Sequence, residues 1–176
     1  MKVGIVGMPN AGKSSLFNAL DLALYKRARS LARTPDSVRW VRRYSSMGEH
    51  GIVWFAIGAA GAVVDGRRRG RWVRATGVVA GAYVVSTSIK LAIGRKRPVI
   101  EDLPHLMATP TGLSVPSSHS TSSFAAARAY GTLLPAAPLY LAASAMAFSR
   151  LYLGVHYPSD IAAGAALGTV LGSAGR

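Results

Sequence analysis

Long uncharged stretches constrain the fold of this chain more than any other feature. The sequence after residue 50 holds five of them, the weakest of which contains one arginine: residues 51–64, 75–89, 120–131, 131–149 and 161–175. Helices of a soluble bundle show a polar face at helical period, whereas these stretches are apolar on all sides. They predict an all-α fold, a polytopic membrane helical bundle of about five transmembrane helices. A soluble bundle of buried helices is the alternative.

Turn residues place the ends of these helices. DGRRRGR separates the first two, Pro135 and Pro138 mark a short turn, and Pro158 suits the first turn of the last helix. Four prolines predict a loop over residues 95–118. We therefore expect helices over about residues 47–65, 72–94, 119–133, 136–155 and 158–174.

Glycines recur at four-residue spacing in the last apolar stretch, at Gly164, Gly168 and Gly172. A row of small residues lets two helices approach closely in lipid, although the same glycines weaken a helix in water. The row predicts close packing, either on another helix of this chain or in a dimer.

The balance of charge points to an anionic partner. There are 21 lysines and arginines against 7 acidic residues, giving a net charge of +14. Because the basic residues cluster between apolar runs, we expect membrane lipids as the partner and no nucleic acid. The predicted location is the cell membrane, crossed several times. Residues 21–46 are basic and broken by Pro35, and are expected to lie at the membrane interface.

Three polar clusters interrupt the apolar pattern, at residues 90–98, 116–120 and 149–160. In the five-helix arrangement they fall at helix ends on the same membrane face, which predicts one pocket. Lys90 and Arg97, seven residues apart and so on one predicted helix face, would form a phosphate cradle with Arg150. Ser117, Ser118 and the N–H groups of the helix start would add an anion site.

Histidine supplies the reactive groups of this predicted pocket. His156 and His119 are the candidates for nucleophile and acid–base group. Asp160, four residues after His156, can accept a bond from one ring nitrogen and so leave the other free to attack. Taken singly, Lys90 fits a membrane anchor, Ser117 a helix cap and Asp160 a first-turn acid. Arg95 and Lys96 are interpreted as anchors only.

The three motifs K-x6-R-P, P-S-x-H and S-R-x5-H-x3-D resemble those of the type 2 phosphatidic acid phosphatase (PAP2) superfamily. The resemblance covers residues 48–174 and departs from most members at Ser118, where they carry glycine. It implies that His156 forms a phosphohistidine, that His119 protonates the leaving oxygen and that Asp160 orients His156. Lys90, Arg97, Ser117, Ser118 and Arg150 would hold the phosphoryl oxygens. No metal and no cofactor are expected.

The substrate implied by the resemblance is a lipid phosphate. The size and composition of the chain, and the stretch of residues 46–51, are similar to actinobacterial members that dephosphorylate decaprenylphosphoryl-5-phosphoribose, a precursor of cell-wall arabinan. A polyprenyl pyrophosphate, phosphatidic acid and phosphatidylglycerophosphate are the alternatives. Glu49 and His50 could reach a head group, or could serve only as interfacial residues.

The N-terminus carries a G-x-x-x-x-G-K-S motif from Gly7 to Ser14. A P-loop needs a strand, a helix and a sheet. Residues 2–6 fit a strand and residues 14–20 a helix, but neither a sheet nor the D-x-x-G and N-K-x-D motifs follow. Residues 1–20 resemble the start of Obg-related GTPases, and we interpret them as a leader from a fusion or a mis-joined start. Residues 47–176 would form the PAP2-type membrane phosphatase domain, and a nucleotide-binding protein is the distant alternative.

Overall fold

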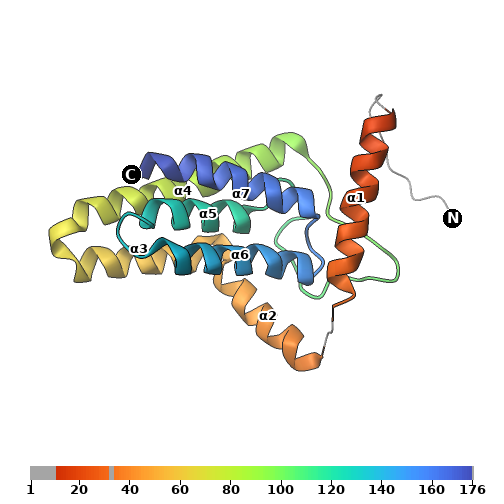
Figure 1. The fold of residues 1–176 in the computed structure, drawn as a ribbon, viewed down its shortest axis with the longest axis horizontal. Coiled ribbons are helices and arrows are strands. Elements are labelled where there is room, and N and C mark those ends of the chain that lie inside the picture. The colour runs from red at the N-terminus through yellow and green to blue at the C-terminus, as the bar shows by residue number, and fades with distance from the viewer. Residues whose placement is uncertain (1–10, 32–33, 176) are drawn as a thin grey trace.

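The structure is a computed structural model that describes residues 11–31 and 34–175, and over these residues the fold is all-α (Figure 1). The strand expected over residues 2–6, and the first half of the P-loop motif, lie outside the described residues. The helices are α1 (Ala11–Arg29), α2 (Pro35–Met47), α3 (Ile52–Val64), α4 (Arg69–Ile93), α5 (Ser118–Tyr130), α6 (Ala136–Tyr152) and α7 (Pro158–Gly172). Three short 3-10 turns are η1 (Glu49–Gly51), η2 (Gly66–Arg68) and η3 (Ser173–Gly175).

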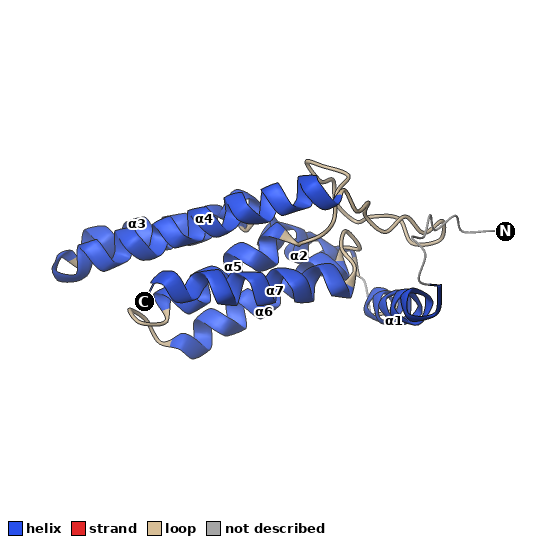
Figure 2. Cartoon of the chain, turned by 90° about the horizontal axis from the view of Figure 1, so that it is seen from above, coloured by secondary structure: helices blue, strands red, loops and turns tan. Residues whose placement is uncertain are grey.

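Helices α3 to α7 form the bundle, and α5 is its most enclosed member. Figure 2 shows α3 and α4 on one side of it, with α6 and α7 on the other. Nine of the thirteen residues of α5 are buried, and most of them are serine or alanine. Trp54 of α3, Trp72 of α4 and Tyr130 of α5 are the large aromatic members of the apolar core. The indole N–H of Trp54 donates to Ser123 Oγ at 2.9 Å, which satisfies a polar group of α5.

The glycine row of α7 packs on α5 of the same chain. A Cβ atom at Gly164 would lie 2.6 Å from the carbonyl oxygen of Ser117, and one at Gly168 only 2.2 Å from that of Thr121. At Gly172 the corresponding distance to the carbonyl oxygen of Ala125 is 2.7 Å. No side chain fits at such distances. Of the two uses that the sequence left open, this row therefore serves packing within the chain.

The helix ends follow the predicted punctuation to within a few residues. Pro158 opens α7, Pro135 caps the start of α6, and residues 95–117 form a loop. The largest difference is at the first predicted helix, which starts at Ile52 rather than near residue 47. There the chain bends through 48° between α2 and α3. His50 and Gly51 take positive φ angles of 51° and 74° at this bend.

Two separate helices, α1 and α2, precede the bundle. The helix expected over residues 14–20 is confirmed as part of α1, which continues to Arg29. Thr34 caps α2 by accepting from Ser37 N, and Pro35 occupies the first turn. Figure 1 shows α1 lying across one end of the bundle rather than along it.

One helix in the described part of the chain is long and apolar enough by itself to cross a membrane. It runs from Gly66 to Ile93, and only 22% of its most apolar window is buried inside the bundle. The bent pair of α2 with η1 and α3 would pass the same test as a single broken span. The five crossings expected from the sequence stay a prediction.

Gly168→Ala tests the α5–α7 contact. The new methyl group would meet backbone atoms that cannot rotate away, so the free energy of unfolding should fall by about 1–3 kcal/mol. Thermal unfolding in detergent measures the effect. Gly77→Ala is the matched control, because nothing lies within 4 Å of its Cβ position on α4. Equal stability of the two variants would contradict the packing described above.

Candidate active site

The three polar clusters meet at one end of the bundle. Lys90 lies in the last turn of α4, Arg150 in the last turn of α6, and Asp160 in the first turn of α7. His119 lies in the first turn of α5, and His156 lies in the short connection between α6 and α7. The three clusters, which up-down alternation of the helices predicted on one face, therefore lie together in the structure.

Three cations are buried together here. The exposed fraction is 7% for Lys90, 8% for Arg97 and 2% for Arg150. The prediction that Lys90 and Arg97 lie on one helix face was wrong. Helix α4 ends at Ile93, and Gly94 turns the chain with a φ of 66°, so Arg97 reaches the site from the loop and not from a helix face shared with Lys90.

The loop holds Arg97 by folding back on itself. Arg97 N donates to Gly112 O at 3.0 Å, and its Nε donates to Thr111 O at 2.8 Å. Its Nη1 donates to Val155 O at 2.7 Å and lies 3.0 Å from His156 Nε2. Burial lowers the pKa of Arg97 to about 10, and the charge of Asp160 opposes this shift. The guanidinium still stays charged at neutral pH and points at the ring of His156.

Arg150 and His119 keep polar atoms for a ligand. Arg150 Nη1 donates to Ser45 Oγ at 2.6 Å and contacts Met107 Sδ at 3.0 Å. Within the described part of the chain, its buried Nε has no hydrogen-bond partner, and neither has the buried Nε2 of His119. Buried polar atoms without partners are costly, so each such atom calls for an explanation, and a bound ligand is one.

His156 is the most enclosed reactive group, with 1% exposure. Because Arg97 can only donate, His156 Nε2 accepts, and the proton of the neutral ring belongs on Nδ1. Nδ1 faces Asp160 Oδ2 at 3.5 Å, which is longer than an ordinary hydrogen bond, as is common before substrate binds. Burial, followed by the charges of Arg97, Arg150 and Lys90, holds the pKa of His156 well below its ordinary value of 6.5. The ring is therefore neutral at neutral pH.

Ser117 and Ser118 form the start of α5. The Ser117 side chain caps the helix by accepting from Ser120 N at 3.4 Å, and Ser117 N donates to Asp160 O at 3.0 Å. The hydroxyl of Ser118 accepts from Ser86 Oγ at 3.1 Å. Both hydroxyls thus have structural partners. The backbone N–H groups that follow Ser117 remain the anion-binding element that the helix start offers.

Glu49 and His50 lie in η1, close to His119. The backbone at Gly48 approaches so closely that a Cβ there would be 3.0 Å from His119 Cδ2. Glu49 is half-buried, and the exposed His50 contacts Tyr83 with its Nδ1 2.7 Å from the phenol oxygen. The bend between α2 and α3 therefore forms one edge of the site.

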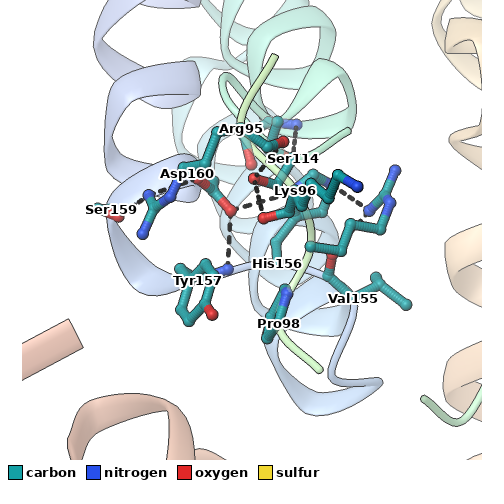
Figure 3. A network of polar contacts seen from close by, with 12 residues as sticks. Arg95, Lys96, Pro98, Ser114, Val155, His156, Tyr157, Ser159 and Asp160 are labelled. Atoms are coloured by element: carbon teal, nitrogen blue, oxygen red, sulfur yellow. Dashed lines mark hydrogen bonds and ion pairs between the residues drawn. The ribbon is translucent and has the colours of Figure 1, made fainter. Parts of the chain in front are cut away.

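Arg95 has a role that the sequence analysis missed. It was interpreted as a membrane anchor, yet its Nη1 donates to Asp160 Oδ1 at 2.8 Å and its Nη2 to Asp21 Oδ2 at 2.9 Å. Figure 3 shows Asp160 within this polar network, with His156 and Tyr157 close by. No local pattern marks Arg95 out from Lys96. The only signal for Asp21 in the sequence is that it is an acidic residue in a basic segment, in a chain that has few acidic residues.

An apolar cavity of about 380 Å³ lies beside the site. It extends along α3 and α6 from the α5–α6 turn to Met146, and its lining includes Tyr44, Trp54, Ile57, Leu139 and Met146. A Cβ atom at Gly48 would meet Met146 Sδ as well as the ring of His119, so Met146 lies close to this edge of the site. The cavity therefore extends from the far end of the bundle towards the polar end, and its lining stops short of the polar clusters.

Comparison with known sequences identifies the family. The sequence model of the PAP2 superfamily matches residues 71–175. Decaprenylphosphoryl-5-phosphoribose phosphatase of Mycobacterium tuberculosis H37Rv is 38% identical over 148 residues, 82% of this chain and 81% of that protein. The phosphatase of the same name from Mycolicibacterium smegmatis is 38% identical over 146 residues, 82% of this chain and 80% of that one. A model described as 50S ribosome-binding GTPase matches residues 2–52.

Solved structures share the fold. Aquifex aeolicus LpxE superposes with a TM-score of 0.77 at 25% identity, over 89% of this chain and 94% of that one. A PAP2-type phosphatidylglycerolphosphate phosphatase from Bacillus subtilis gives 0.73 at 23% identity, over 89% of this chain and 82% of that one. A bacterial vanadium-dependent iodoperoxidase gives 0.72 at 18%, over 98% of this chain and 51% of that one. The last two likenesses show the fold alone.

The fold, the motifs and these matches define a phosphoric monoester hydrolase with an all-α bundle. The chain belongs to the PAP2 superfamily, as the three motifs predicted.

Arg97→Gln tests the electrostatics of the site. Loss of the nearby positive charge should raise the pKa of His156 towards 6.5. As the pH falls, the variant's ring should therefore become protonated, and so unreactive, at a higher pH than in the wild type. The acid limb of kcat/KM, measured on residual phosphatase activity, should move upward. Arg97→Lys keeps the charge and should leave the limb near its wild-type position, as should Lys96→Gln at an exposed neighbouring site. An unchanged limb in Arg97→Gln would contradict this account of His156.

Proposed function

We propose that this chain is an integral membrane lipid phosphatase that transfers the phosphoryl group of a polyprenyl-linked phosphomonoester to His156 and then to water, without a metal. The observation that carries the proposal is the burial of three cations around a neutral histidine whose Nε2 lies 3.0 Å from Arg97 Nη1. A phosphate brings two negative charges and several acceptor oxygens, which complement such a cradle.

Binding of phosphate would first rearrange the hydrogen bond between Arg97 and His156. The phosphoryl oxygens would be held by Lys90, Arg97 and Arg150, together with N–H groups at the start of α5. When Arg97 donates to a phosphoryl oxygen, the lone pair of His156 Nε2 is released for attack. The same donors then face the charge that develops on the oxygens in the transition state.

The reaction would proceed in two steps. His156 Nε2 bonds to phosphorus and the bond from phosphorus to the lipid oxygen breaks. His119, in the protonated form that the bound phosphate dianion stabilises, gives that oxygen a proton and becomes neutral. A water molecule then attacks phosphorus, His119 takes its proton, the N–P bond breaks and inorganic phosphate leaves. Asp160, facing Nδ1, stabilises the positive charge that the ring carries while it is phosphorylated.

The apolar surface of the bundle supports a membrane location and a lipid substrate. Large side chains point outward without protein cover, among them Val64, Leu141 and Val170, which are 86%, 73% and 70% exposed. The cavity along α3 and α6 would take the first isoprene units of the lipid, with the phosphate at the polar end. We infer a multi-pass protein of the inner membrane.

Decaprenylphosphoryl-5-phosphoribose is the substrate favoured by the mycobacterial relatives, which match most of this chain and carry that name. Its ribose would lie beside η1, where Glu49 can accept hydrogen bonds from sugar hydroxyls and His50 is exposed. A polyprenyl pyrophosphate, phosphatidic acid and phosphatidylglycerophosphate are alternative substrates for the same chemistry.

Phosphate release in detergent with a chelator present tests the mechanism. The substrates are decaprenylphosphoryl-5-phosphoribose, a polyprenyl pyrophosphate, phosphatidic acid and phosphatidylglycerophosphate. Wild-type protein should be active, with the ribose phosphate fastest. His156→Ala should lose a factor of roughly a thousand or more, because no nucleophile remains, and His119→Ala should lose roughly a hundredfold or more.

Lys13→Ala serves as the control for the P-loop alternative and should keep the wild-type rate. Micromolar GTP binding that is lost in Lys13→Ala, together with no phosphate release from any lipid, would favour the nucleotide-binding protein instead. Release that persists in folded His156→Ala would refute the phosphohistidine route.

Glu49→Ala tests recognition of the head group. Loss of one hydrogen bond, about 1.4 kcal/mol, should raise KM for the ribose phosphate roughly tenfold and leave KM for phosphatidic acid unchanged. Glu101→Ala, at an exposed carboxylate of the loop, is the matched control. An equal rise in KM for both substrates would show that Glu49 stabilises the bend between α2 and α3 and does not bind the ribose.

A further inference from the structure

Helix α1 docks on the active-site end of the bundle through one face. Asp21, Tyr25 and Arg29 are spaced four residues apart and buried, while most of their neighbours on α1 are exposed. Tyr25 donates from its hydroxyl to Gly154 O at 3.1 Å, and Arg29 Nη1 donates to Tyr152 O at 3.0 Å. This face therefore contacts the connection that carries His156.

Asp21 is the polar centre of this contact, with 5% exposure. Its Oδ1 accepts from the backbone N–H of Ser159 at 2.9 Å, in the first turn of α7. Its Oδ2 accepts from Ser159 Oγ at 2.5 Å and from Arg95 Nη2 at 2.9 Å. A carboxylate with three donors at a helix start is held firmly in one place.

Arg95 connects this carboxylate to Asp160. Its Nη1 lies 2.8 Å from Asp160 Oδ1, and its guanidinium stacks over the ring of Tyr157 at 4.4 Å from the centroid. The other oxygen of Asp160 accepts from Tyr157 N at 2.9 Å and faces His156 Nδ1. The guanidinium therefore fixes the rotation of the carboxylate that faces the candidate nucleophile.

We propose that Asp21 and Arg95 are positioning residues for the phosphatase reaction: Asp21 holds the guanidinium of Arg95, which holds Oδ1 of Asp160 and so keeps Oδ2 directed at His156. This inference rests on the proposed function of His156 and extends the site to the N-terminal helix, beyond residues 71–175 matched by the PAP2 model. It also gives the carboxylate of Asp160, which has no exposed surface, a positively charged hydrogen-bond partner.

A merely structural role would make a different prediction. If Asp21 only anchored α1 to the start of α7, its loss would lower thermal stability and the amount of folded protein. It would leave kcat per folded molecule and the environment of the His156 ring unchanged. The two roles are therefore separated by measurements made on folded protein.

The test compares Asp21→Asn, Arg95→Gln and the double variant in the full chain. Each single variant should lower kcat roughly ten- to a hundredfold, the usual cost of losing such a supporting partner, with KM unchanged. The double variant should lose no more than the worse single one, because the two residues act as one unit. Asp36→Asn, at an exposed ion pair with Arg39 on α2, is the matched control and should keep wild-type kcat.

A second measurement does not depend on turnover. In protein labelled with ¹⁵N-histidine, the signals of His156 are assigned by their loss in His156→Ala. The Nδ1 signal should shift in Asp21→Asn and Arg95→Gln and stay in place in Asp36→Asn. If kcat and this signal are unchanged while stability falls, the positioning role is refuted. If wild type cleaves no lipid but the Nδ1 signal shifts as stated, the proposed function fails and the positioning of His156 stands.

Discussion

The structure depends on keeping three positive charges together away from water. Lys90, Arg97 and Arg150 are each more than nine-tenths buried at the polar end of an otherwise apolar bundle. Removing a charge from water is costly unless it is paired and hydrogen-bonded. Carbonyls of Thr111 and Val155 satisfy part of Arg97, and a serine hydroxyl satisfies part of Arg150. Among the described residues, none accepts a hydrogen bond from the buried Nε of Arg150.

Such a cradle requires a rigid frame, because like charges separate wherever the backbone can move. The frame comes from close packing of small residues. The glycine row of α7 brings its backbone against the backbone of α5, and α5 itself is largely alanine and serine. These two helices start at the site, so their contact fixes Ser117 and Asp160 relative to each other through the bond from Ser117 N to Asp160 O. Packing along these two helices thereby sets the geometry at the polar end of the bundle.

The N-terminal helix contributes to the same balance. Two carboxylates, Asp21 and Asp160, both accept from the guanidinium of Arg95. Asp160 faces Nδ1 of the His156 ring, and Arg97 of the cationic cradle faces its Nε2. The ring thus lies between cations that lower its pKa and a carboxylate that faces its Nδ1. Helix α1 supplies Asp21 to this group of charges, although α1 lies within residues 2–52 matched by the GTPase model.

The sequence by itself determined the all-α class, the helix punctuation and the residues that meet at the polar end, because apolar runs, prolines and spaced motifs are local signals. Only the tertiary structure decided how those residues meet. Arg97 comes from a loop that folds back, not from the helix of Lys90, because Gly94 ends that helix. Asp21 and Arg95 lie 74 residues apart, and their pairing depends on how α1 crosses the end of the bundle. Long-range contacts of this kind leave no periodic trace in the sequence, since no local pattern specifies which distant residue will supply the partner.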